Sequence, residues 1–142
     1  VAAADRLPLV AVFGDALQRG QIEQRLEPLA WSSDFLGRAL YVPVTKPETF
    51  KVTGGVQSKA GVVVIQPGVF GLNGKVIREI APDISDEQLK QSLVEALGRH
   101  QPSELSYEEH RRQGAAAGKR WESKTPNTDG QGRRRFGPGL RR

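Results

Sequence analysis

The feature that most constrains the fold is a change of character near residue 99. Residues 1–99 carry regularly spaced apolar residues and equal numbers of basic and acidic side chains, eleven of each. Residues 100–142 hold ten basic and five acidic residues, which supplies the whole formal net charge of +5. A segment with high charge and little apolar content does not offset its own ordering entropy. We therefore expect a domain over 7–99, an N-terminal extension over 1–6 and a basic low-complexity tail over 100–142 that is disordered unless bound.

Four short apolar segments within the neutral part are typical of β-strands. Their lengths and their β-branched content favour strands that are at least partly buried. Asn73 and Gly74 suit a two-residue turn with positive φ, so 61–80 is predicted as a hairpin. Pro43 removes one backbone donor, which limits pairing on one side of its strand. The segments are Leu7–Phe13, Leu40–Val44, Gly61–Ile65 and Val76–Ile80.

Two segments between and after these strands predict helices. Gln18–Leu29 places apolar residues at intervals of four and three, and Pro28 should end or kink the helix near its close. Ser85 and Gln88 form a capping-box pattern, which indicates a helix from Ser85 to Gly98. A further short helix over residues 106–112 is also compatible with the sequence. The residues expected on the buried faces are Ile22, Leu26, Leu29, Leu89, Leu93, Ala96 and Leu97.

The order of these elements predicts a mixed α/β sheet. Strands that flank a helix are expected to be parallel, and the hairpin that follows is antiparallel. With helices on its faces, this arrangement resembles the thioredoxin fold over residues 7–99. After Phe13, the spacing aligns Gln18-Arg19-Gly20-Gln21 without a gap to the Cys-Gly-Pro-Cys tetrad that opens a helix in thioredoxins.

The departures from this family bear directly on function. Gln18 and Gln21 stand at both cysteine positions, and the chain has no cysteine at all. A glutamine amide does not form a thiolate or a mixed disulfide. The family also places a cis-proline before the first strand of its hairpin, whereas 56–60 contains no proline. The resemblance therefore implies a degenerate redox position, and we expect no enzymatic activity.

Other candidate sites have simpler interpretations. His100 and His110 are predicted as solvated tail residues, because a metal site needs three or four convergent ligands. The glycine-rich stretch 68–74 lacks the ending of a phosphate loop and is interpreted as the hairpin turn. Trp31 is expected in the core or at its edge, and Glu23, Glu27 and Asp34 are expected as solvated carboxylates. We predict no metal and no cofactor.

The basic tail is the sharpest local feature. Its last ten residues contain five arginines, which attract polyanions and acidic surfaces. Three interpretations of these arginines remain open: a solvated terminus, docking on an acidic protein surface, and contact with nucleic acid or an anionic membrane. Trp121 lies among cations, and docking on a partner or on the domain itself is favoured over base stacking. The predicted partner-binding residues are Trp121, Arg133, Arg134, Arg135, Phe136, Leu140, Arg141 and Arg142.

These observations lead to a non-catalytic, thioredoxin-like interaction module, a subunit or assembly factor whose basic tail docks on a protein partner. The alternative is a polyanion-binding protein in which the arginine-rich tail contacts nucleic acid. No apolar run approaches the ~18 residues that span a bilayer. The chain opens with Val1 and three alanines. If these follow a cleaved signal peptide, export to the periplasm or the extracellular space is slightly favoured.

Overall fold

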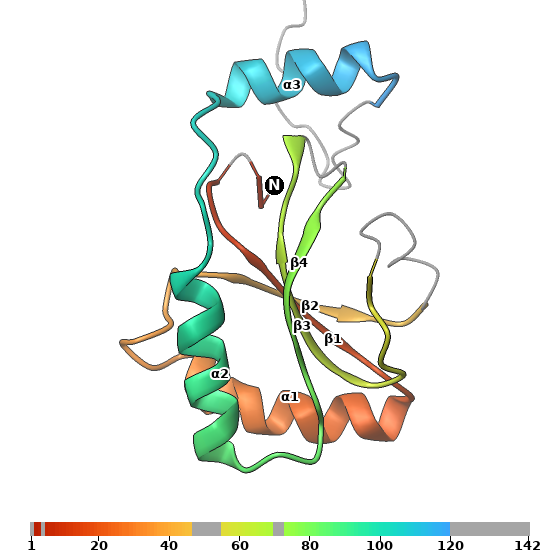
Figure 1. Ribbon diagram of the computed structural model, residues 1–142, viewed down its shortest axis with the longest axis vertical. Helices are drawn as coiled ribbons and strands as arrows, with labels where there is room; N and C mark the ends of the chain where they lie inside the picture. Colours follow the sequence, from red (N-terminus) through yellow and green to blue (C-terminus); the bar gives the residue numbers. More distant parts are fainter. Residues whose placement is uncertain (1, 4, 47–54, 70–72, 120–142) are drawn as a thin grey trace, which may run out of the picture.

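The computed structural model describes residues 2–3, 5–46, 55–69 and 73–119. In these residues the chain forms four strands and three helices (Figure 1). In chain order they are β1 (Leu9–Phe13), α1 (Ala16–Ala30), β2 (Leu40–Val44), β3 (Gly61–Gln66), β4 (Lys75–Ile80), α2 (Asp86–Gly98) and α3 (Tyr107–Ala116). No helix in the described part of the chain is long and apolar enough to cross a membrane.

The four strands form one mixed sheet in the order β2-β1-β3-β4. Strand β1 is parallel to β2, with Leu9 opposite Leu40, and antiparallel to β3, with Phe13 opposite Gly61. Strands β3 and β4 form the antiparallel hairpin, with a register shift between Val64 and Ile65. The predicted α/β class and both predicted strand directions are confirmed.

Helices α1 and α2 cover one face of the sheet and enclose the larger core (Figure 1). Alternate residues of the central strands β1 and β3 enter this core, and the residues between them are buried on the opposite face. Burial on both faces explains why these two strands are continuous apolar runs. The first face contributes Val10, Val12, Val62 and Val64 to the core, and the second contributes Ala11, Phe13, Val63 and Ile65.

The helix boundaries follow local capping chemistry. Helix α1 begins at Ala16, two residues before the predicted start, because Asp15 and Gln18 form a capping box there. The helix ends two residues after Pro28, in agreement with the expected effect of the proline. Helix α2 has the predicted capping box, in which Ser85 and Gln88 satisfy each other's backbone N–H groups.

Trp31 corrects one prediction, because its side chain is 73% exposed rather than part of the core. It follows α1 directly, five positions after the buried Leu26. Five positions correspond to about 140° around a helix, which turns Trp31 away from the sheet. Phe35, 1% exposed, supplies the buried aromatic ring in this region instead.

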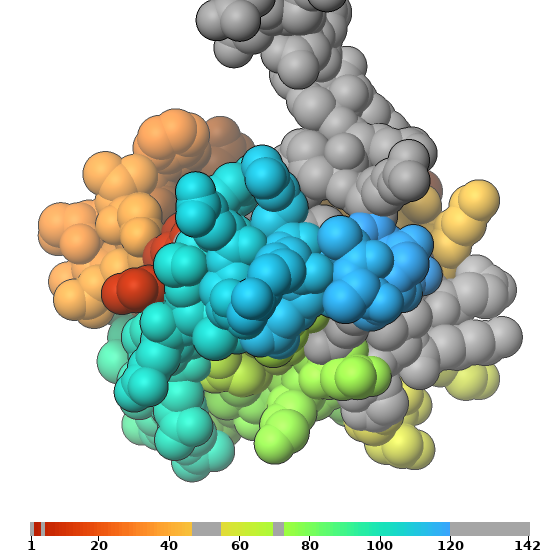
Figure 2. Space-filling model, turned by 90° about the horizontal axis from the view of Figure 1, so that it is seen from above, coloured from red at the N-terminus to blue at the C-terminus, as the bar shows by residue number. Residues whose placement is uncertain are grey.

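Helix α3 lies at one end of the molecule, apart from α1 and α2 (Figure 1), and Figure 2 views the molecule from that end. It extends the expected 106–112 helix to Ala116, and Ser106 caps its first turn. His110 is only 2% exposed, so the prediction that it is a solvated tail residue is wrong. Gly114, one turn later on the same side of the helix, is also buried. These two residues mark the face of α3 that packs inward.

Candidate functional site

The start of helix α1 is where the degenerate redox position was predicted. Asp15 is the N-cap, and its Oδ1 accepts the backbone N–H of Gln18 at 2.8 Å. In return, the Gln18 side-chain Oε1 accepts the backbone N–H of Asp15 at 3.1 Å. The Asp15 carboxylate and the side-chain oxygen of Gln18 are therefore committed to the helix itself. Gln21 lies one turn further along and is exposed.

This geometry differs from the alignment in one respect. The resemblance implies that Gln18–Gln21 opens the helix, whereas these residues occupy positions three to six of α1. The residue that stands before the helix is Asp15. A carboxylate here occupies the positive end of the helix dipole and accepts one of its free N–H groups. Because that charge is already present, a second anion is disfavoured at this end.

The chain preceding β3 packs tightly against the start of α1. Gly14 has φ of +136°, and a Cβ atom added there would lie 3.0 Å from the Ala60 Cβ. Gly61 has φ of +137°, and its added Cβ would lie 2.3 Å from the Ile80 carbonyl oxygen. Among the described residues there is no cis peptide bond. The two glycines thus permit a close backbone approach at the edge of the predicted site.

A groove of about 570 Å³ runs beside this position, between α1 and the segment that follows β4. Three glutamine side chains dominate its helical wall, and a proline and an aspartate form the opposite wall. The amides of Gln21 and Gln24 can both donate and accept hydrogen bonds, as a peptide backbone does, and the charged Arg25 and Asp83 lie beside them. The lining residues are Gln18, Gln21, Ile22, Gln24, Arg25, Pro82 and Asp83.

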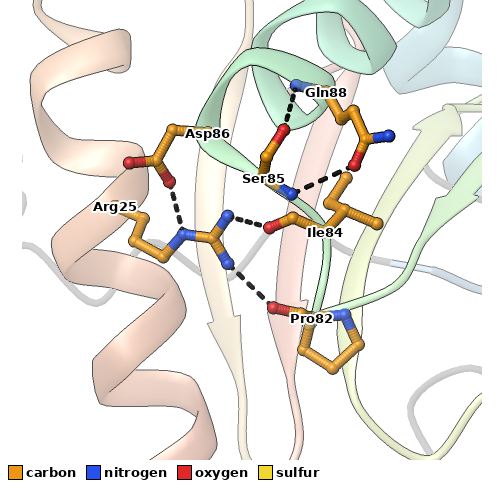
Figure 3. Close-up of polar contacts among 6 residues, drawn as sticks. All are labelled: Arg25, Pro82, Ile84, Ser85, Asp86 and Gln88. Atoms are coloured by element: carbon orange, nitrogen blue, oxygen red, sulfur yellow. Dashed lines mark hydrogen bonds and ion pairs between the residues drawn. The ribbon is translucent and has the colours of Figure 1, made fainter.

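Arg25 fixes the two walls of this groove to each other (Figure 3). Its Nε donates to Asp86 Oδ1 at 2.7 Å, and its Nη1 donates to the Pro82 carbonyl at 2.8 Å. Its Nη2 donates to the Ile84 carbonyl. The guanidinium therefore holds two carbonyls from the chain between β4 and α2 and the side chain of the first residue of α2. Sequence reasoning missed Arg25, because its partners lie 57 to 61 residues away and no local pattern marks them.

A second groove, of about 320 Å³, lies between α1 and the edge strand β2. Its walls are mainly apolar, and the charged residues that line it are the carboxylates Glu23 and Glu27. Burial raises the pKa of Tyr41 above its ordinary value, which agrees with the apolar character of the groove. The remaining lining residues are Val12, Leu26, Ala30, Tyr41, Val42 and Pro43.

A third hollow, of about 680 Å³, combines apolar walls with the basic residues Arg6, Arg38 and His100. Burial lowers the pKa of His100 below its ordinary value, so the imidazole is neutral over a wider pH range. The one carboxylate in the lining, Asp34, is 3.4 Å from the ammonium of Lys90. This hollow lies at the C-terminal end of α2, where basic side chains complement the negative pole of the helix.

Several large apolar side chains remain at the surface. Leu17 and Trp31 are each more than 70% exposed, and they lie near opposite ends of α1. Leu36, Val94 and Tyr107 are also at least half exposed. Desolvated aromatic and aliphatic side chains supply much of the binding energy at protein interfaces.

The predicted tail site lies outside the described residues. These positions are Trp121, Arg133, Arg134, Arg135, Phe136, Leu140, Arg141 and Arg142. Within the described ranges, no group of three or more His, Asp or Glu side chains converges as a metal site would require. Comparison with known proteins found no matching family model, no matching curated protein and no matching solved structure.

Proposed function

We propose that this chain is a non-catalytic, thioredoxin-like interaction module, which serves as a subunit or assembly factor of a larger complex. Its folded domain supplies a rigid surface, and its basic C-terminal segment docks on an acidic surface of a protein partner. The strand order β2-β1-β3-β4, with β1 parallel to β2 and a terminal hairpin, supports the thioredoxin-like part of the proposal.

The capping box of α1 is the observation that carries the non-catalytic part. Asp15 and Gln18 bind each other's backbone N–H groups at the position where a redox protein presents its nucleophile. The chain has no cysteine that could replace them. Thiol–disulfide exchange requires a thiolate that attacks a disulfide sulfur, and neither an amide nor a carboxylate performs that step.

The surface of the folded domain supports the binding part of the proposal. The groove beside α1 presents amide groups, and Arg25 holds its walls in a fixed relation. Leu17 in α1 and Trp31 directly after it are exposed and offer apolar contacts. A preformed surface of this kind binds with a small loss of conformational entropy. The arginines of residues 133–142 then add long-range attraction to an acidic partner.

Affinity purification from native extract tests this proposal. The bait is the full chain, and the matched control is the full chain with Arg133, Arg134, Arg135, Arg141 and Arg142 changed to Ser. We expect one protein to co-purify with the full chain in a fixed ratio, and its recovery should not change after nuclease treatment. The control bait should recover less of it. Recovery of nucleic acid alone, lost after nuclease treatment and with an affinity that falls steeply with salt, would instead support the polyanion-binding alternative.

A further inference from the structure

The groove between α1 and β2 has a chemistry that points to a specific kind of ligand. Its floor and its β2 wall are apolar, and its α1 wall carries Glu23 and Glu27. Both carboxylates are exposed, and neither has an ion-pair partner in the described part of the chain. We call these two residues with Leu26, Ala30, Tyr41 and Pro43 the acidic groove.

One of the two carboxylates, Glu27, has an unfavourable position in the helix that carries it. Glu27 lies in the last turn of α1, where the helix dipole is negative, and that turn has no basic residue. An acidic side chain is least favourable at this end of a helix. The carboxylates and the helix terminus therefore contribute negative potential, and none of the described residues that line the groove is basic.

An exposed indole extends this surface. Trp31 follows Glu27 by four positions, so the two residues lie on the same side of the helix end. Arginine binds carboxylates through its planar fork and stacks on aromatic faces, more readily than lysine does. Carboxylates, a tryptophan and an apolar wall together favour an arginine-rich segment that also carries large apolar side chains.

The chain itself contains such a segment in Arg133–Arg142. Glu23 and Glu27 are about 6 Å apart along the helix axis. Arg133 and Arg135 are about 6.6 Å apart in an extended chain and lie on the same side of it. In such an extended chain Arg134 and Phe136 project to the opposite side, where Phe136 would face Tyr41 and Pro43. Both the charge and the spacing of the segment match the groove.

The connection allows the segment to reach most of the domain surface. Fourteen peptide links join Lys119 to Arg133. Their extended reach is about 46 Å, and the path over the surface of a compact domain about 35 Å across, from one pole to the other, is about 55 Å.

We propose that residues 133–142 dock in the acidic groove of the same chain, with Arg133 and Arg135 paired to Glu23 and Glu27 and with Phe136 against Tyr41 and Pro43. This inference rests on the groove and not on the proposed function. A partner with a more acidic surface would compete with the groove for the same arginines. Self-docking would then hold the tail until that partner is present.

Photo-crosslinking in the full chain tests the proposal. A benzophenone amino acid replaces Phe136, and the products are mapped by mass spectrometry after irradiation of a dilute solution at low salt. We expect crosslinks to Leu26, Ala30, Tyr41 or Pro43 within one chain. The double variant Glu23→Gln, Glu27→Gln should lower their yield about fivefold, as expected for two partly exposed ion pairs.

The matched control is Glu104→Gln, Glu108→Gln, which removes two exposed carboxylates outside the groove. It should leave the yield unchanged, and circular dichroism should show that both double variants stay folded. Crosslinks to other parts of the domain, or only between two chains, would overturn docking within one chain. An equal loss of yield in both double variants would show general charge attraction and would also overturn the proposal.

Discussion

The side chain of Gln66 forms two hydrogen bonds with the backbone of Gln101, as the backbone of a neighbouring β-strand would. Its side-chain Nε2 donates to the Gln101 carbonyl at 2.5 Å, and its Oε1 accepts the Gln101 backbone N–H at 2.8 Å. The last residue of β3 is thereby tied to the segment that follows α2. Because α3 comes next and buries His110, residues 100–116 contribute contacts to the described structure.

Truncation tests where the folded part ends. A chain ending at Lys119 keeps the Gln66–Gln101 pair and α3, whereas a chain ending at Arg99 loses both. We expect the first to melt close to the full chain. The second should lose about 2 to 4 kcal/mol, because it loses two hydrogen bonds and the burial of one helix face. Thermal unfolding followed by circular dichroism measures both.

The full chain with Gln66→Ala is the control, since it removes only the two hydrogen bonds. It should lose about 1 to 2 kcal/mol, which is less than the chain ending at Arg99. Equal melting of the two truncated chains would show that α3 adds no stability and that the sequence-based boundary at residue 99 holds.

This example shows which part of the fold the sequence determines locally. Short-range patterns predicted the strands, the capping box of Ser85 and the directions of the β1–β2 and β3–β4 pairs. The contact between Gln66 and Gln101 did not, because two glutamines 35 positions apart carry no periodic signal. The prediction that Trp31 is buried was wrong for a related reason. Its apolar character predicts burial, but its position around the axis of α1 turns the side chain to solvent.

Arg25 should stabilise the junction between α1 and α2 mainly through the two carbonyls it binds. Arg25→Ala removes all three hydrogen bonds, and we expect a loss of about 2 kcal/mol. Asp86→Asn removes only the charge of a side chain that is 75% exposed, so it should cost about 0.5 kcal/mol. Urea denaturation of the variants measures both values. A larger effect of Asp86→Asn would mean that the ion pair, rather than carbonyl binding, provides the stability.

Gly61 should tolerate no side chain. Gly61→Ala places a Cβ atom 2.3 Å from the Ile80 carbonyl oxygen at a φ of +137°, which an alanine rarely adopts. We expect a loss of about 3 kcal/mol or more. Gly20→Ala is the matched control, because that position is helical and nothing lies within 4 Å of the added atom. It should raise stability by about 0.5 to 1 kcal/mol. Similar melting temperatures for the two variants would contradict this account.

The candidate site was accessible to sequence reasoning only in part. Gln18 was singled out by its spacing from Phe13, yet its role in the capping box, as the third residue of the helix, depends on where α1 begins. Asp15 and Gln18 do have the spacing of such a box, and that signal was present in the sequence. Arg25 and the groove walls depend on the approach of α1 to the segment after β4, which only the tertiary structure reveals.

The capping box leads to the last prediction, that the chain does not catalyse thiol–disulfide exchange. Asp15 and Gln18 supply no thiol at the start of α1, and the chain has no sulfur atom elsewhere. Reduction of insulin by dithiothreitol should therefore proceed at the same rate with and without the protein. The full chain with Asp15→Ala should be equally inactive, although the loss of its cap should lower stability by about 1 kcal/mol. A clear acceleration by the unmodified chain would refute the non-catalytic interpretation, because catalysis would then have to come from groups other than a thiolate.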